Sequence, residues 1–159
     1  MTIRIVCAGK LKERYWIEAA AEFQKRLSRF AQVEIAEVAD EKTPDTLSPA
    51  EEAQAMAKEG ERMLARIAPQ EHVIALTIDG KRYDSPGFAA RLQSLQRMGK
   101  SRLTFVIGGS LGLSGAVLTR ADETLSLSDM TFPHRIARIL LLEQVYRAFK
   151  ILENETYHK

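Results

Sequence analysis

The residues of this chain that are best suited to chemistry lie in its last third, in two turns and a short polar tail. One turn, residues 108–114, contains three glycines, and the other spans residues 128–133. Each follows an apolar segment typical of a β-strand, and open α/β sheets bind their ligands at turns of this kind. The tail ends in three side chains that can stack on a base, transfer a proton and pair with phosphate, namely Tyr157, His158 and Lys159.

The glycine-rich turn allows two interpretations. Glycine lets the backbone approach a ligand closely and adopt positive φ without steric cost, and a tight turn can need the same freedom for packing alone. The turn is not a dinucleotide-binding fingerprint, because only Gly9 follows the first predicted strand, where that motif belongs. Gly80 and Lys81 are followed by Arg82, so the phosphate-binding P-loop is absent too. These absences argue against a dinucleotide enzyme and a P-loop ATPase.

The chain offers no metal-binding constellation. His72, His134 and His158 stand far apart, and no cluster of cysteine or carboxylate provides partners at ligand spacing. No G-x-S-x-G nucleophile motif is present. An enzyme with this sequence is therefore expected to use no metal and to work by positioning two ligands.

Composition is that of one ordinary globular domain, residues 1–159, with 45% hydrophobic and 28% charged residues. The net charge of +2 is too small to argue for nucleic acid by itself. Cys7 lies in an apolar run, which favours a buried small side chain over a reactive thiol. The first residues lack a signal-peptide layout, and no apolar run approaches the roughly 20 residues of a membrane helix. We expect a cytoplasmic protein that does not enter membranes.

The predicted elements alternate between strand and helix along the whole chain. Ser48, Pro49 and Glu51 form a capping box that opens one helix, and Ser85 with Pro86 is expected to open the next in the same way. Apolar runs predict strands at residues 3–8, 33–38, 72–78, 103–107 and 124–127, the second of them with one exposed face and at a sheet edge. Helical spacing and caps predict helices at residues 13–30, 48–67, 85–99, after 114, and 133–154. This alternation predicts an α/β fold with a mainly parallel sheet flanked by helices.

Taken together, four segments resemble the small SPOUT methyltransferases, and specifically the RlmH family, which methylates N3 of a pseudouridine in large-subunit ribosomal RNA. They are Gly-Gly-Ser-Leu-Gly-Leu-Ser at 108–114, Leu-Ser-Leu-Ser-Asp-Met-Thr-Phe-Pro-His at 125–134, Glu-Gln-Val-Tyr-Arg-Ala-Phe-Lys at 143–150, and the final Tyr-His-Lys. The resemblance covers essentially the full length. It implies the SPOUT fold with a C-terminal trefoil knot, S-adenosylmethionine as cofactor, and an obligate homodimer.

The resemblance also implies which residues hold the cofactor, because loops after successive strands enclose it in the knot. Carried over by position, these residues are Leu76, Gly108, Gly109, Leu127, Ser128, Asp129, Met130, Thr131 and Phe132. Their types suit the task, since backbone groups can bind adenine while the apolar side chains form walls. Without the resemblance, Leu76 and Leu127 fit the strand core equally well.

The chemistry implied is transfer of a methyl group to a ring nitrogen that carries a proton, and imidazole handles protons at neutral pH. His134 and His158 are the candidates, and sequence does not decide between them. Tyr157 is placed to stack on the base. The candidate RNA contacts are Arg135, Arg138, Arg147 and Lys159. The alternative is that these cations belong only to a solvated polar face.

The helix at residues 133–154 is apolar over more than one stripe. Either it is wedged deep in its own core, or one face meets the sheet and another meets a second subunit, which could bring the tail of one subunit to the site of the other. Two rivals to the expected activity remain open. One is another SPOUT methyltransferase acting on a tRNA base or a ribose hydroxyl, and the other is a non-catalytic RNA-binding module of ribosome assembly.

Overall fold

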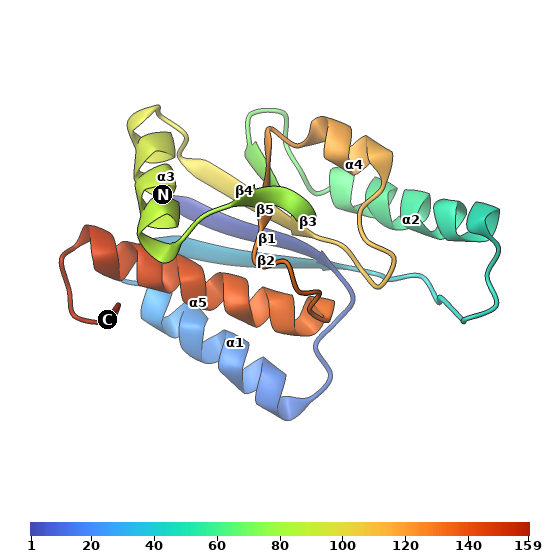
Figure 1. Cartoon of the computed structure of the whole chain (residues 1–159), viewed down its shortest axis with the longest axis horizontal. Coiled ribbons are helices and arrows are strands. Elements are labelled where there is room, and N and C mark those ends of the chain that lie inside the picture. The colour runs from blue at the N-terminus through green and yellow to red at the C-terminus, as the bar shows by residue number, and fades with distance from the viewer.

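The computed structural model describes all 159 residues and contains one five-stranded sheet with helices on both faces (Figure 1). The strands are β1 (Thr2–Ala8), β2 (Gln32–Val38), β3 (His72–Arg82), β4 (Arg102–Ile107) and β5 (Glu123–Ser126). The helices are α1 (Arg14–Leu27), α2 (Pro49–Leu64), α3 (Ser85–Arg97), α4 (Gly115–Arg120) and α5 (His134–Leu152). All strand pairs are parallel, in the order β2-β1-β4-β3-β5, which confirms the predicted fold class and the edge position of β2.

Two hydrophobic cores fill the two faces of the sheet. Because side chains alternate along a strand, Ile3, Ile5 and Cys7 of β1 join the core under α1, α3 and α5, whereas Val6 and Ala8 join the core under α2 and α4. Figure 1 shows this division, with α1 beside α5 on one face and α4 beside α2 on the other. Cys7 is 2% exposed, and burial raises the pKa of its thiol to about 11, so it serves as a core residue.

The caps of the helices explain where two of them begin. Ser48 accepts a hydrogen bond from the Glu51 amide and Glu51 reaches back to the Ser48 amide, which confirms the predicted capping box. The cap predicted for α3 is wrong by one residue. Asp84 is the N-cap and accepts from the Gly87 amide, because a carboxylate fills this position as well as serine does.

The third strand does not end near Ile78 as predicted. It is interrupted at residues 77–80 and then resumes, so Leu125 of β5 pairs first with Leu76 and again with Lys81. Gly80 makes the interruption possible, because a Cβ there would lie 2.7 Å from the backbone of Leu125. The bulge turns Ile78 outward, where it is 56% exposed. Asp79 and Gly80 are typical of a turn and therefore predicted the end of the strand, but here they form a bulge within it.

Candidate active site

A pocket of about 810 Å³ opens at the carboxyl edge of the sheet, where the bulge of β3 and the segments after β4 and β5 meet the start of α5. This size suits a nucleoside-sized ligand. Eight of the nine predicted cofactor residues line it: Leu76, Gly108, Gly109, Leu127, Ser128, Met130, Thr131 and Phe132. Asp129 does not line it. Its carboxylate is exposed and pairs with Arg82.

The pocket is apolar and carries no formal charge on its lining side chains, apart from a protonated state of His134. Ile78, Leu118 and Met130 form an exposed apolar rim, at 56%, 40% and 74% exposure. Neither Ile78 nor Leu118 was among the predicted site residues, because Ile78 was expected to end a strand and Leu118 to belong to the short helix after residue 114. Apolar walls next to backbone-rich turns fit a ligand with a flat heteroaromatic ring, as S-adenosylmethionine has.

The glycine turn is shaped by two close approaches within the protein. A Cβ on Gly108 would lie 2.6 Å from the backbone of Gly112, with which Gly109 forms a short antiparallel bridge. A Cβ on Gly109 would lie 3.0 Å from the carboxylate of Glu59 in α2. Gly108 is therefore needed for packing in the turn itself, and a side chain at Gly109 would require the Glu59 carboxylate to move.

Hydroxyl groups fix the second turn. Ser126 donates to the carbonyl oxygen of Ser128 at 3.0 Å, and the Ser128 hydroxyl accepts from the Met130 amide at 3.0 Å. Short side-chain to backbone bonds of this kind stabilise tight turns in place of regular structure. They leave the Met130 side chain free at the mouth of the pocket.

His134 is the one predicted proton-handling residue that lines the pocket. Its half-buried imidazole has a lowered pKa, chiefly because burial penalises the charged form and then because Arg135 and Arg138 lie nearby. Asp40 opposes this shift. An imidazole with a lowered pKa is neutral at pH 7 and is able to accept a proton.

Arg138 does not lie where an RNA contact would require, and that prediction is wrong. The residue is 2% exposed, and its guanidinium donates to Glu37 at 2.7 Å and to the Gly9 carbonyl at 3.0 Å. It ties α5 to the ends of β1 and β2, which places it behind His134. Arg135 is half-buried and lies 3.8 Å from Glu13.

The tail folds back along α5 from a left-handed residue. Asn154 has φ of 54°, a conformation that asparagine tolerates better than most residues, and it ends the helix. Glu155 then pins the chain, because its carboxylate pairs with Arg29 at 2.7 Å and with Lys150. Tyr157 thereby packs back against α5, on the side that carries Tyr146 and Arg147.

At that side Tyr157, Glu143, Arg147 and His158 form what we call the tail cluster. The Tyr157 hydroxyl donates to Glu143 at 3.1 Å, and Arg147 donates to the same carboxylate at 2.5 Å while its guanidinium covers the Tyr157 ring at 4.7 Å. Arg147 also lies 3.3 Å from Nδ1 of His158. Glu143 was not among the predicted site residues, although its spacing of four from Arg147 is typical of a pair on a helix surface.

The pocket and the tail cluster lie far apart on the same chain. His134 begins α5, and at a rise of about 1.5 Å per residue Arg147 follows about 20 Å further along the axis. The structure therefore does not bring together His134 and the three tail residues that sequence placed in one site. Lys159 is exposed at the end of the tail.

The outer face of α5 is only partly covered. Seven of its residues are buried against its own fold, so much of its apolar character belongs to the core. Ile136 and Leu140 are half-buried but pack against neither hydrophobic core. With Glu143 and Arg147 they form one stripe at helical spacing, which runs from the pocket to the tail cluster.

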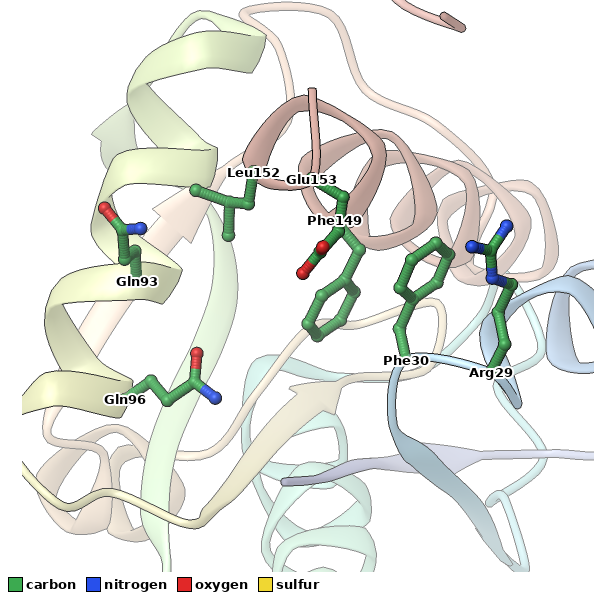
Figure 2. Close-up of a pocket in the computed structure, with 7 residues that line it drawn as sticks. All are labelled: Arg29, Phe30, Gln93, Gln96, Phe149, Leu152 and Glu153. Carbon is green, nitrogen blue, oxygen red and sulfur yellow. The ribbon is translucent and has the colours of Figure 1, made fainter. Parts of the chain in front are cut away.

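A second cavity, of about 320 Å³, lies at the other end of α5. Figure 2 shows Gln96 extending from α3 toward Phe149, which stacks on Phe30 with ring centroids 5.5 Å apart. No predicted site residue lines it. The structure has no group of three or more His, Cys, Asp or Glu residues arranged to hold a metal ion. None of its helices has both the length and the apolarity to span a membrane.

Comparison with known proteins identifies the family. The profile described as "Predicted SPOUT methyltransferase" matches residues 1–158. The chain is 56% identical to ribosomal RNA large subunit methyltransferase H of Listeria monocytogenes serotype 4b and 52% identical to the protein of that name from Ruminiclostridium cellulolyticum, in both cases over 100% of each chain.

Solved structures share the fold at low identity. A probable methylase family protein from Haemophilus influenzae Rd KW20 superposes with a TM-score of 0.56 at 16% identity, over 99% of this chain and 70% of that one. The tRNA (m1G37) methyltransferase from Aquifex aeolicus gives a TM-score of 0.55 at 15% identity, over 92% of this chain and 70% of that one. The trefoil knot stays a prediction. This chain belongs to the SPOUT methyltransferase family and, within it, to the group of the ribosomal RNA large subunit methyltransferase H proteins.

Proposed function

We propose that this protein transfers a methyl group from S-adenosylmethionine to N3 of a pseudouridine in large-subunit ribosomal RNA, acting as a homodimer with composite active sites. The names of its relatives and its membership of the family support the substrate class. The observation that carries the composite site is the separation of about 20 Å between the pocket and the tail cluster along α5. Two antiparallel copies of α5 would bring the pocket of one subunit to the tail of the other.

The residues around the pocket fit the cofactor. Leu76, Leu127 and Phe132 would flank its adenine, and the backbone groups of the two turns would bind the polar edges of the ring. When bound, the cofactor supplies an electrophilic methyl group on a positively charged sulfur. The lining offers no charged side chain to move a proton, which would leave proton handling to His134.

The two histidines would have different roles. A guanidinium can only donate hydrogen bonds, so Nδ1 of His158 accepts from Arg147 and the hydrogen lies on Nε2. His158 is thereby set to donate to a carbonyl oxygen of the base. His134, held neutral in the pocket, would accept the N3 proton of the pseudouridine as the nitrogen takes the methyl group.

The remaining tail residues would hold the nucleotide. The Tyr157 ring is fixed between Tyr146, at a centroid distance of 4.9 Å, and the Arg147 guanidinium. A ring fixed in this way presents an edge and a hydroxyl to an extruded base at little entropic cost. Lys159 and Arg135 would neutralise phosphates near the two ends of the stripe on α5.

Mixed dimers test the composite site directly. One subunit carries Gly109→Val, which forces a side chain into the Glu59 carboxylate and should disable its pocket, and the other lacks residues 157–159. If sites form between subunits, a mixed dimer regains one complete site, and random mixing restores roughly a quarter of wild-type activity. If each subunit uses its own tail, every mixed dimer stays inactive and the composite site is wrong.

The substrate is tested separately. Mass spectrometry of ribosomal RNA from cells lacking this protein should show one pseudouridine without its methyl group, restored by the wild-type chain. Loss of a methyl from a tRNA base or a ribose hydroxyl would instead support another SPOUT activity. Failure to bind S-adenosylmethionine in calorimetry would support an RNA-binding module without catalysis.

A further inference from the structure

Glu59 is a buried carboxylate that the proposed mechanism does not use. It lies in α2 at 4% exposure, and it forms no ion pair. The two cations beside it, Lys58 and Arg62, pair with Glu41 instead, at 3.7 and 3.4 Å. Its Oε2 accepts one hydrogen bond, from the Glu41 amide at 2.7 Å.

This carboxylate stands directly behind the glycine turn of the pocket. A Cβ on Gly109 would lie 3.0 Å from Oε1 and 3.2 Å from Oε2 of Glu59, so only the backbone of the turn separates the carboxylate from the pocket. The Thr43 and Ser110 hydroxyls, 2.8 Å apart, hold the neighbouring loop to the same turn. The position of Glu59 is therefore well defined relative to the wall that Gly109 forms.

A carboxylate in this place is costly to the fold. Burial raises the pKa of Glu59, the charges of Asp40 and Glu41 act in the same direction, and the Glu41 amide and Arg62 only partly offset them. A glutamine would fill the same space and keep the hydrogen bond without the charge. The fold alone gives no reason for a negative charge here.

We propose that Glu59 is a specificity-determining residue that favours the cationic sulfonium of S-adenosylmethionine over the neutral thioether of S-adenosylhomocysteine. The inference rests on the proposed function. No lining side chain carries a competing positive charge while His134 is neutral, and Glu59 is shielded from bulk water at 4% exposure. A buried charge in such a medium interacts more strongly with a ligand cation than a surface charge does.

The consequence for turnover is easier release of product. Methyl transfer removes the positive charge from sulfur, so the attraction from Glu59 disappears in the step that creates the product. Binding energy that depends on the ligand's charge distinguishes substrate from product, whereas the apolar contacts to adenosine hold both equally.

Calorimetry on Glu59→Gln tests the proposal with three probes: S-adenosylmethionine, S-adenosylhomocysteine, and sinefungin, in which a protonated amine replaces the sulfonium. We expect affinity for the two cationic ligands to fall by about tenfold, and affinity for the neutral one to change by less than about twofold. The midpoint of thermal unfolding without ligand should rise, because the buried charge is gone. Glu61→Gln, which removes an exposed carboxylate from the same helix, is the matched control and should change none of these values.

Three results would overturn the proposal. Equal weakening of all three ligands would make Glu59 a structural support for the turn. Unchanged affinities would mean that the carboxylate is protonated and exerts no field. A rise in affinity for the cationic ligands would mean that Glu59 disfavours them, which is the opposite of the proposed effect. If the wild-type protein binds none of the probes, the proposed function itself fails, which is distinguishable from each of these results.

Discussion

The hydroxyl of Tyr157 donates a hydrogen bond to Oε1 of Glu143, 3.1 Å away on the last helix. The same oxygen accepts from Arg147. One carboxylate thus orients both the aromatic ring and the guanidinium of the tail cluster. Burial raises the pKa of the Tyr157 hydroxyl, and the charge of Glu143 raises it further, so the hydroxyl stays protonated as a donor.

Removing residues 157–159 should leave cofactor affinity nearly unchanged and lower methyl transfer by at least roughly 100-fold, since positioned groups for the base are lost. Tyr157→Phe keeps the ring but frees Glu143, and we expect a smaller fall, of about tenfold, in kcat. Single-turnover methylation of ribosomes measures both. Tyr15→Phe, at a tyrosine that is 62% exposed, is the control. Near wild-type methylation by the truncated protein would leave the tail without a catalytic role.

The pH dependence of methyl transfer should report His134. Its pKa lies below the ordinary 6.5 because burial disfavours the charged form, so activity should fall on the acid side with a midpoint below 6.5. Asp40 raises this pKa, so Asp40→Asn should move the acid limb to still lower pH, while Asp45→Asn in the same loop should not. If the acid limb of the pH profile is unchanged in His134→Gln, a group other than His134 accepts the proton.

The same histidine should contribute to acid sensitivity of the fold. Because its pKa is lower in the folded state than in the unfolded state, the unfolded chain binds more protons as pH falls below about 6.5. The contribution of neutral His134 to stability is therefore complete above about pH 6.5. It is lost as pH falls from there to the pKa of His134 in the folded state. Denaturant titrations of His134→Gln between pH 5 and 7.5 should show a shallower loss than the wild type.

Leu140→Glu should disrupt the proposed dimer. It places a charge in the half-buried apolar part of the α5 stripe, which packs against neither core. Analytical ultracentrifugation at micromolar concentration should then show a monomer, and methyl transfer should be lost while the fold remains. Met98→Glu, at a methionine that is 62% exposed at the end of α3, should stay dimeric. A monomeric wild-type protein would contradict the composite site.

Glu71 tests stability away from the site. It is 3% exposed at the amino edge of the sheet and accepts hydrogen bonds from Arg4 at 2.9 Å and Thr104 at 2.6 Å. Burial by itself would raise the pKa of Glu71, but these donors and the charge of Arg4 outweigh it and lower the pKa. Glu71→Gln should reduce the free energy of unfolding by about 3 kcal/mol at pH 7, because Arg4 loses a buried partner.

The sign of the pH effect follows from the lowered pKa. The contribution of Glu71 is present above the unfolded pKa of about 4.5 and is lost as pH falls through the folded value. The stabilities of wild type and Glu71→Gln should therefore begin to converge as pH falls below about 4.5. Cofactor affinity should not change. Glu18→Gln, which breaks an exposed pair with Arg14, should have little effect at any pH.

Local patterns in the sequence predicted the elements of this fold well, because strand alternation, helical spacing and the Ser48 capping box each depend on neighbouring residues. The strand order β2-β1-β4-β3-β5 was not predictable in the same way, since it depends on contacts between distant segments. The end of the third strand was predicted wrongly for a related reason. The part of β3 after the bulge at residues 77–80 is held by pairing with β5, which the local turn residues do not reveal.

The candidate site shows the same limit. Position along the chain suggested nine cofactor residues, and eight of them line the pocket. Arg138 was predicted to be a surface cation, but it is buried against Glu37 and Gly9, which are distant in the sequence. Nothing in the sequence distinguished Glu59 from the other glutamates of α2 as a residue near the pocket. Burial and partners from other elements, rather than residue type, decide what such charges do.

The left-handed conformation of Asn154 sets a rule for how the tail can vary among related chains. The helix before it fixes the angular position of Arg147, and each residue added or removed between them would rotate the tail by about 100° around the axis. Single-residue insertions or deletions in this interval should therefore be rare. A change of three or four residues, close to one full turn, is the length variation that would keep Tyr157 facing the same side of the helix.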